Sequence, residues 1–227
     1  MLTALSVAAA VLGPGSGPPG DHPPTVVCSD EDGTTLTADI DADGYLDEVR
    51  DPDRSGDATV VFSRATTASE VSVGEGRTRW QRAWSALSPE METRGAFGDF
   101  DGDGYVDVAL FHSQEDDGDY TRDNVTVHEV RHGPLARDLS GSRNSDIRMR
   151  GGGFVYAARA ADENGDGRAE LHVFQSSGDG AVQQYTVRYE EDGVLLTSVE
   201  GGFRSRGDVD ELGLGWRSFG ICAYPAR

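Results

Sequence analysis

An acidic nonapeptide occurs three times in the 227-residue chain and constrains its fold more than any other feature. The pattern is D-x-[DN]-x-D-G-x-x-[DE], and its copies occupy residues 39–47, 99–107 and 162–170. We call these segments the first, second and third acidic loops. They start 60 and 63 residues apart (39 to 99, then 99 to 162), and such regular spacing is typical of an internal structural repeat. The sequence therefore predicts three similar units.

The residue types in the loops predict that each one binds a calcium ion. Ca²⁺ takes about six to eight oxygen ligands in a flexible geometry. Acids at positions 1, 3 and 5 of a tight loop can turn toward one centre, and glycine at position 6 permits the sharp bend. The position-7 backbone carbonyl and the position-9 acid complete the shell. Without a cation, carboxylates this close together would repel strongly. The predicted ligands of about three Ca²⁺ ions are Asp39, Asp41, Asp43, Tyr45, Asp47, Asp99, Asp101, Asp103, Tyr105, Asp107, Asp162, Asn164, Asp166, Arg168 and Glu170.

The loops are not EF-hands. An EF-hand needs a glutamate at position 12, where this chain has Arg50, Leu110 and Val173. The residues after each loop instead resemble a β-strand, as in the apolar run Val-Asp-Val-Ala-Leu-Phe at 106–111. The loops therefore lie between strands rather than between helices.

Residues 95–110 (GAFGDFDGDGYVDVAL) resemble an FG-GAP, or VCBS-type, repeat. Such repeats form the N-terminal β-propeller of integrin α chains and occur in many bacterial surface proteins. The resemblance extends over about 34–200, although only the second copy has the Phe97-Gly98 pair. It implies that each repeat is a four-stranded blade with calcium in the loop between its first two strands.

The pattern of apolar residues and turns agrees with blades of this kind. The fold class that we predict is all-β, with a β-propeller-like array of about three four-stranded blades in a small or incomplete ring. Either the blades close into a ring, or the array stays open and its edges allow self-association. The last segment, 216–224, looks like the opening strand of a fourth unit. The predicted strands are 34–40, 45–50, 58–63, 69–73, 105–112, 123–132, 135–139, 168–175, 181–190 and 193–199.

The ends of the chain predict export to the cell surface or the medium. Residues 1–23 combine a signal-peptide-like apolar run, too short to span a bilayer, with a Pro/Gly-rich linker. Residues 24–227 are predicted to be a single domain. Cys28 and Cys222 are the two cysteines, and in an exported protein such a pair indicates a disulfide that joins the two ends. Two unrelated buried thiols are the alternative.

The charge of the chain excludes some partners. Its 40 acidic residues exceed its 20 basic residues, all arginine, and give a net charge of −20. Binding to nucleic acid or to anionic lipid needs a basic surface, so neither is expected, and no transmembrane helix is predicted. The remaining partners are a protein or a glycan.

One motif offers an enzymatic alternative. His128-Glu129-Val130-Arg131-His132 matches the H-E-x-x-H motif of zinc metallopeptidases. That chemistry needs a helix, whereas the β-branched residues before the motif and Gly133-Pro134 after it favour a strand. We therefore predict a non-catalytic binding or surface protein with structural calcium. The alternative is a zinc-dependent hydrolase that uses His128, Glu129 and His132.

Overall fold

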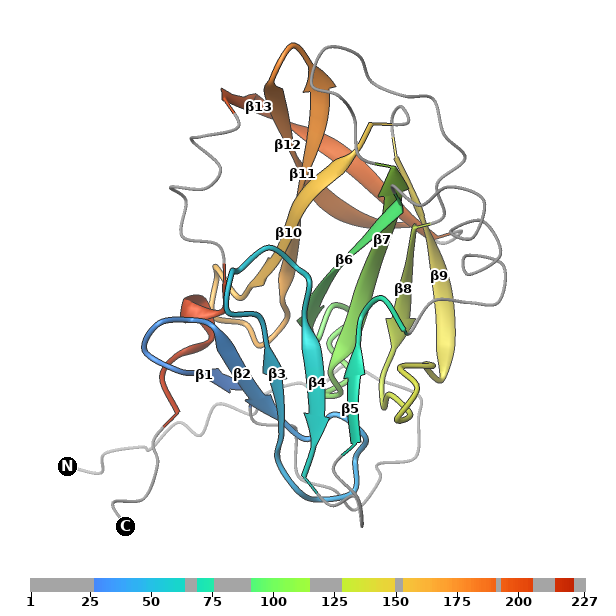
Figure 1. The fold of residues 1–227 in the computed structure, drawn as a ribbon, viewed down its shortest axis with the longest axis vertical. Helices are drawn as coiled ribbons and strands as arrows, with labels where there is room; N and C mark the ends of the chain where they lie inside the picture. The colour runs from blue at the N-terminus through green and yellow to red at the C-terminus, as the bar shows by residue number, and fades with distance from the viewer. Residues whose placement is uncertain are drawn as a thin grey trace, which may run out of the picture.

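The chain folds into antiparallel β-sheets, which confirms the all-β prediction (Figure 1). The computed structural model describes residues 27–63, 69–75, 91–114, 128–149, 153–190, 193–205 and 215–222. These residues contain thirteen strands and one short 3-10 turn, η1 (Arg217–Phe219). No helix among them is long and apolar enough to cross a membrane. The predicted signal-like segment and linker at 1–23 lie outside the described residues.

The first sheet has five strands in the order β1-β2-β3-β4-β5, and each neighbouring pair is antiparallel. They are β1 (Cys28–Ser29), β2 (Thr35–Ala38), β3 (Asp47–Arg50), β4 (Thr59–Phe62) and β5 (Ser69–Ser72). Every second residue of β4 is buried, as expected for a strand that packs one face on a core. Strands β2 to β5 form a meander, and the first acidic loop connects its first two strands.

Two further meanders repeat this arrangement, with consecutive strands antiparallel throughout. The second meander consists of β6 (Met91–Gly98), β7 (Asp107–Gln114), β8 (His128–His132) and β9 (Arg143–Arg148). The third consists of β10 (Val155–Ala161), β11 (Glu170–Gly178), β12 (Ala181–Glu190) and β13 (Gly193–Ser205). Each acidic loop connects the first two strands of its meander, where the family resemblance implied that it would lie.

One predicted strand, 135–139, is wrong. Residues 133–142 form an irregular connection between β8 and β9, in which the Leu139 N–H donates to the Ala136 carbonyl at 2.8 Å and closes a turn. The fourth strand of this meander is β9, whose sequence is polar except for Ile147, its one buried residue. Because β9 has no alternating apolar pattern, its sequence gave no sign of a strand.

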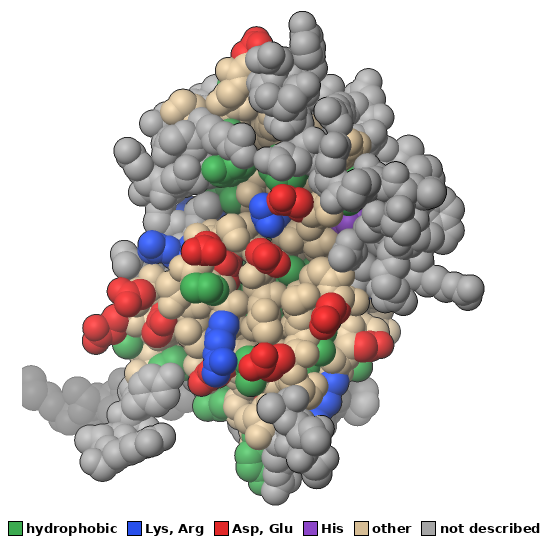
Figure 2. Space-filling model, viewed as in Figure 1, with side chains coloured by type: hydrophobic (Ala, Val, Ile, Leu, Met, Phe, Trp, Pro, Cys, Tyr) green, Lys and Arg blue, Asp and Glu red, His purple; other side chains and the backbone are tan. Residues whose placement is uncertain are grey.

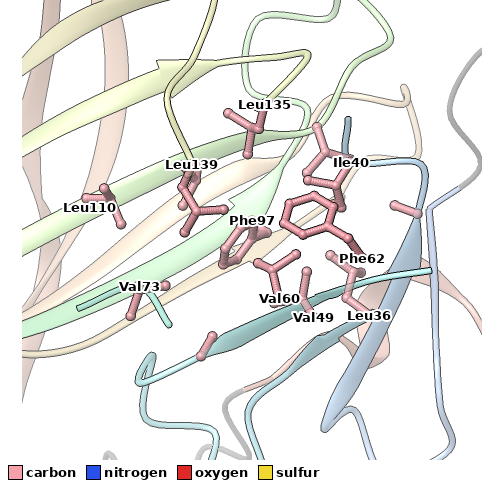
Figure 3. Packing of buried hydrophobic residues seen from close by; sticks show 14 of the residues in the cluster. Leu36, Ile40, Val49, Val60, Phe62, Val73, Phe97, Leu110, Leu135 and Leu139 are labelled. Atoms are coloured by element: carbon pink, nitrogen blue, oxygen red, sulfur yellow. The ribbon is translucent and has the colours of Figure 1, made fainter. Parts of the chain in front are cut away.

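Both faces of the paired strands β6 and β7 are buried. Neighbouring side chains on β6 and β7 alternate between two hydrophobic clusters: Phe97 and Leu110 belong to the cluster shared with the first meander, and Ala96 and Phe111 to the cluster shared with the third. Figure 3 shows Phe97 close to side chains from the first sheet, and Leu139 from the β8–β9 connection on its other side. Burial on both faces explains the uninterrupted apolar run in β7.

The second and third meanders join along their last strands. Strands β9 and β13 pair in parallel, with Val194 opposite Ile147, so that the two meanders form one eight-stranded sheet. Their first strands also approach each other, because a Cβ added to Gly98 of β6 would lie 3.2 Å from the Cβ of Ala160 in β10. The described sheets are open at their edges, and a propeller-like arrangement stays a prediction.

The first and last described segments meet at the edge of the first sheet (Figure 1). Cys28 and Cys222 form the predicted disulfide. Ser29 makes a parallel bridge with Ile221, and its N–H and carbonyl bond backbone groups on either side of Ile221 at 2.8 and 2.9 Å. The segment after Trp216, predicted to open a fourth unit, makes within its described residues a single bridge to β1 through Ile221.

Candidate metal loops

The three acidic loops share one backbone conformation. The glycine at position 6 has a positive φ in each copy, as the motif predicted. Position 4 also has a positive φ, a feature that the sequence analysis missed because this position holds alanine in the first loop. The φ angles are 57° and 85° for Ala42 and Gly44, 78° and 92° for Gly102 and Gly104, and 74° and 88° for Gly165 and Gly167. The motif therefore encodes one shape three times.

The same backbone-to-carboxylate hydrogen bonds hold each loop. The position-1 aspartate accepts from the N–H of position 6, at 2.9 Å (Asp39 from Gly44), 2.9 Å (Asp99 from Gly104) and 3.1 Å (Asp162 from Gly167). The position-5 aspartate accepts from the N–H of position 7, at 3.0 Å (Asp43 from Tyr45), 2.9 Å (Asp103 from Tyr105) and 2.9 Å (Asp166 from Arg168). These bonds turn the carboxylates inward.

The position-9 acid closes each loop by accepting from the N–H of position 2. The distances are 3.1 Å (Asp47 from Ile40), 2.9 Å (Asp107 from Phe100) and 2.8 Å (Glu170 from Glu163). Asp47 and Asp107 are buried, and each accepts a second backbone N–H, from Ser63 and Gly133 at 2.8 Å. The position-9 acid thus holds the backbone of the loop in place through these hydrogen bonds, independently of any role as a metal ligand.

Carboxylate oxygens converge in the first two loops. In each loop, one oxygen from each of positions 1, 3 and 5 lies within 4.8 Å of the others; the two groups are Asp39, Asp41 and Asp43, and Asp99, Asp101 and Asp103. The donor set is that of a hard cation such as Ca²⁺. In the third loop the position-3 residue is Asn164, whose amide donates to Glu170 at 2.7 Å.

Arginine from the β8–β9 connection contacts the first acidic loop. The Arg137 Nε lies 3.0 Å from an Asp41 oxygen, and another guanidinium nitrogen lies 3.5 Å from Asp43. The second Asp41 oxygen is buried and has no hydrogen-bond partner among the described residues. Figure 2 shows acidic and arginine side chains side by side across the described part of one face. No feature of the sequence indicated that Arg137 would approach this loop.

The second acidic loop has two cationic neighbours, His132 at the end of β8 and Arg143 at the start of β9. Both contact the same Asp101 oxygen, at 3.1 and 2.5 Å. The close approach of His132, together with Arg143, lowers the pKa of Asp101 to about 2. Burial disfavours the charged imidazole, but Asp101 and Asp107 outweigh it and raise the pKa of His132 to about 9. Burial raises the pKa of Asp99 to about 6.

The H-E-x-x-H segment is strand β8, as predicted, and the structure places its two histidines in different surroundings. His132 lies at the second acidic loop, whereas the His128 ring packs against Phe111, with centroids 5.4 Å apart. Glu129 forms a buried ion pair with Arg131 at 2.7 Å. The pairing of two histidines on one helical turn, which the zinc peptidase motif requires, is absent from this strand.

A fourth loop of the same shape, at 51–57, escaped the sequence analysis. Arg54 and Gly56 have positive φ angles of 54° and 87° at the equivalents of positions 4 and 6. The buried Asp51 carboxylate accepts from the Gly56 N–H at 2.6 Å, like a position-1 aspartate. The sequence there is D-x-D-x-S-G, with Thr59 at position 9. Allowing serine at position 5 and threonine at position 9 would have found it.

The second and third acidic loops lie next to each other. The Ala169 N–H donates to the Asp99 carbonyl at 2.7 Å. Residues of both loops line a cavity of ≈ 190 Å³. Its lining includes Asp99, Tyr105, Asp162 and Phe219. The two candidate sites are therefore neighbours in space.

Comparison with protein-family models, with curated proteins and with solved structures found no match for this chain.

Proposed function

We propose that this chain is an exported calcium-binding repeat protein of FG-GAP or VCBS type with a non-catalytic binding or surface role. Its three meanders would be blades of a propeller-like array, and its ligand a protein or a glycan. One observation carries the proposal: a single loop geometry recurs between the first two strands of every meander, and carboxylate oxygens converge in the first two of these loops. A divalent cation bound in each loop would explain why the acids, and not only the loop shape, recur at the same positions.

The role proposed for calcium is structural. Each loop joins the first two strands of a meander, and its carboxylates repel one another unless a cation or an arginine lies between them. The first two loops are also adjacent to the β8–β9 connection, whose Leu135 N–H donates to the Ile40 carbonyl at 3.0 Å. An ion in a loop would therefore stabilise contacts between meanders as well as the loop itself.

Export rests on the disulfide between Cys28 and Cys222, because disulfides persist mainly in oxidising compartments. The bond joins segments that are 194 residues apart. Secretion or display at the cell surface would also supply the calcium that the loops need. Strand β5, which ends the first sheet among the described residues, offers a place for self-association.

Chelation tests the proposal. An ion at 100-fold excess over its dissociation constant adds about 2.7 kcal/mol, and the whole free energy of unfolding of a domain is about 5–15 kcal/mol. We expect EGTA to lower the melting temperature strongly, and added Ca²⁺, but not Mg²⁺, to restore it. Asp101→Ala and Asp103→Ala should each weaken calcium binding in titration calorimetry. A melting curve that is unchanged after exhaustive chelation would contradict the proposal.

A further inference from the structure

His132 directs one ring nitrogen into the second acidic loop. Its side chain is only 1% exposed, and Nδ1 lies 3.1 Å from an Asp101 oxygen and 3.5 Å from an Asp107 oxygen. One donor atom from each of the three residues lies within 4.8 Å of the other two. This group is separate from the Asp99, Asp101 and Asp103 group of the same loop, and Asp101 belongs to both.

The other ring nitrogen of His132 has its own partner. Nε2 lies 3.0 Å from the Ser145 hydroxyl, whereas Nδ1 has no aligned hydrogen bond among the described residues. When Nε2 carries the ring hydrogen and donates it to Ser145, the Nδ1 lone pair faces two carboxylates. Metal-bound histidines are commonly oriented by such a hydrogen bond on the far nitrogen. A cation must lie between this lone pair and the carboxylates, and it is either a proton on Nδ1 or a metal ion.

The distances and donor types fit a small transition-metal ion. Two ligands that lie about 2.0–2.1 Å from a tetrahedral ion are about 3.3 Å apart, and the two Nδ1–oxygen distances lie on either side of this value. One imidazole nitrogen with carboxylate oxygens suits Zn²⁺ and its neighbours in the first transition row, whereas Ca²⁺ takes oxygen ligands. We propose that His132, Asp101 and Asp107 form a transition-metal position beside the calcium position of the second acidic loop.

The first meander shows that this nitrogen is not a general feature of the repeat. The N–H of Ser63 bonds the position-9 acid of the first loop as that of Gly133 does in the second. The residue before each is the last of its strand, Phe62 in β4 and His132 in β8. A buried phenylalanine therefore takes the place of the imidazole, and the first loop offers oxygen alone.

Cobalt(II) is a suitable probe, because it replaces Zn²⁺ in mixed nitrogen–oxygen sites and absorbs visible light. Protein with the calcium loops saturated should bind one equivalent of Co²⁺ with a visible absorption band, and excess Ca²⁺ should not remove it. His132→Gln should abolish the band and leave calcium stoichiometry unchanged. Ser145→Ala should weaken Co²⁺ binding about tenfold or more. His128→Gln, the matched control, should bind Co²⁺ as the unmodified chain does.

Three results would overturn this second position. They are the absence of Co²⁺ binding, a Co²⁺ band that survives in His132→Gln, and displacement of Co²⁺ by Ca²⁺. The first would mean that a proton alone fills the gap between His132 and the carboxylates. Circular dichroism shows whether each variant is folded, and Ser145→Ala keeps the test valid if His132→Gln is not. The inference rests on the proposed function through Asp101 and Asp107, which are also predicted calcium ligands of the second acidic loop. Loss of the calcium-dependent melting shift, measured separately, would count against calcium and not against this site.

Discussion

The second and third acidic loops have the same backbone shape in opposite surroundings. In the second loop, position 2 is the buried Phe100 and position 9 is the fully buried Asp107. In the third loop, position 2 is Glu163, whose side chain is exposed, and position 9 is the partly exposed Glu170. The motif and its hydrogen bonds therefore fix the conformation of the loop, whereas neighbouring elements decide its burial and its charge balance.

The largest difference that we expect between these loops concerns position 9. Asp107 accepts backbone N–H groups from Phe100 and Gly133 inside the protein, and an unpaired buried N–H costs about 1–3 kcal/mol. Asp107→Ala should therefore lower the free energy of unfolding by about 3–5 kcal/mol in urea titrations. Glu170→Ala, the matched variant in the third loop, should cost about 1 kcal/mol, because water can replace the lost acceptor.

Equal losses in the two variants would mean that burial does not distinguish the loops. Both titrations should be run in EGTA as well as in calcium, so that loss of an ion is separated from loss of the hydrogen bonds. In EGTA the difference between Asp107→Ala and Glu170→Ala should persist.

The contrast between local loop chemistry and contacts with distant elements also explains which features could be predicted from the sequence. Local chemistry is visible in a sequence, so the nonapeptide predicted three loops, their glycine bends and their places between strands. Contacts between distant segments are not visible. Arg137 and Arg143 look like ordinary polar residues, and His132 belongs to a motif that points to a different chemistry. The polar strand β9 was missed for a related reason, since its partners β8 and β13 make it a strand rather than its own pattern.

A smaller difference concerns two buried histidines in the second and third meanders. Burial, with a contribution from His112, lowers the pKa of His128 to about 3 from an ordinary 6.5. Protonation therefore favours the unfolded chain. The contribution of the neutral His128 to the free energy of unfolding is complete above about pH 6.5 and decreases as the pH falls toward 3. Two units below 6.5, at about pH 4.5, the loss should reach about 2–3 kcal/mol.

Burial also lowers the pKa of His172, but its Nε2 lies 3.1 Å from Glu163, which favours the charged form.

Melting temperatures between pH 7.5 and 4.5 would measure this effect. His128→Gln should remove part of the acid sensitivity, and His172→Gln should remove less. If the His128→Gln curve runs parallel to that of the unmodified chain, the buried neutral histidine does not set the acid limit of the second meander.

The smallest effect that we expect is a change in the calcium affinity of the third loop. Asn164→Asp supplies the position-3 charge that the other two loops have, which should tighten calcium binding there about tenfold, or about 1.4 kcal/mol. The gain is limited because the Asn164 amide now donates to Glu170 at 2.7 Å, and the new carboxylate would instead repel Glu170 when calcium is absent.

Calcium titrations followed through the amide resonances of Gly104 and Gly167 would resolve the two loops. Asp101→Asn, the reverse change in the second loop, should weaken binding at Gly104 alone. Unchanged or weaker binding at Gly167 in Asn164→Asp would mean that position 3 does not contribute a ligand to the third loop, and that the third loop keeps the shape of the repeat without its ion.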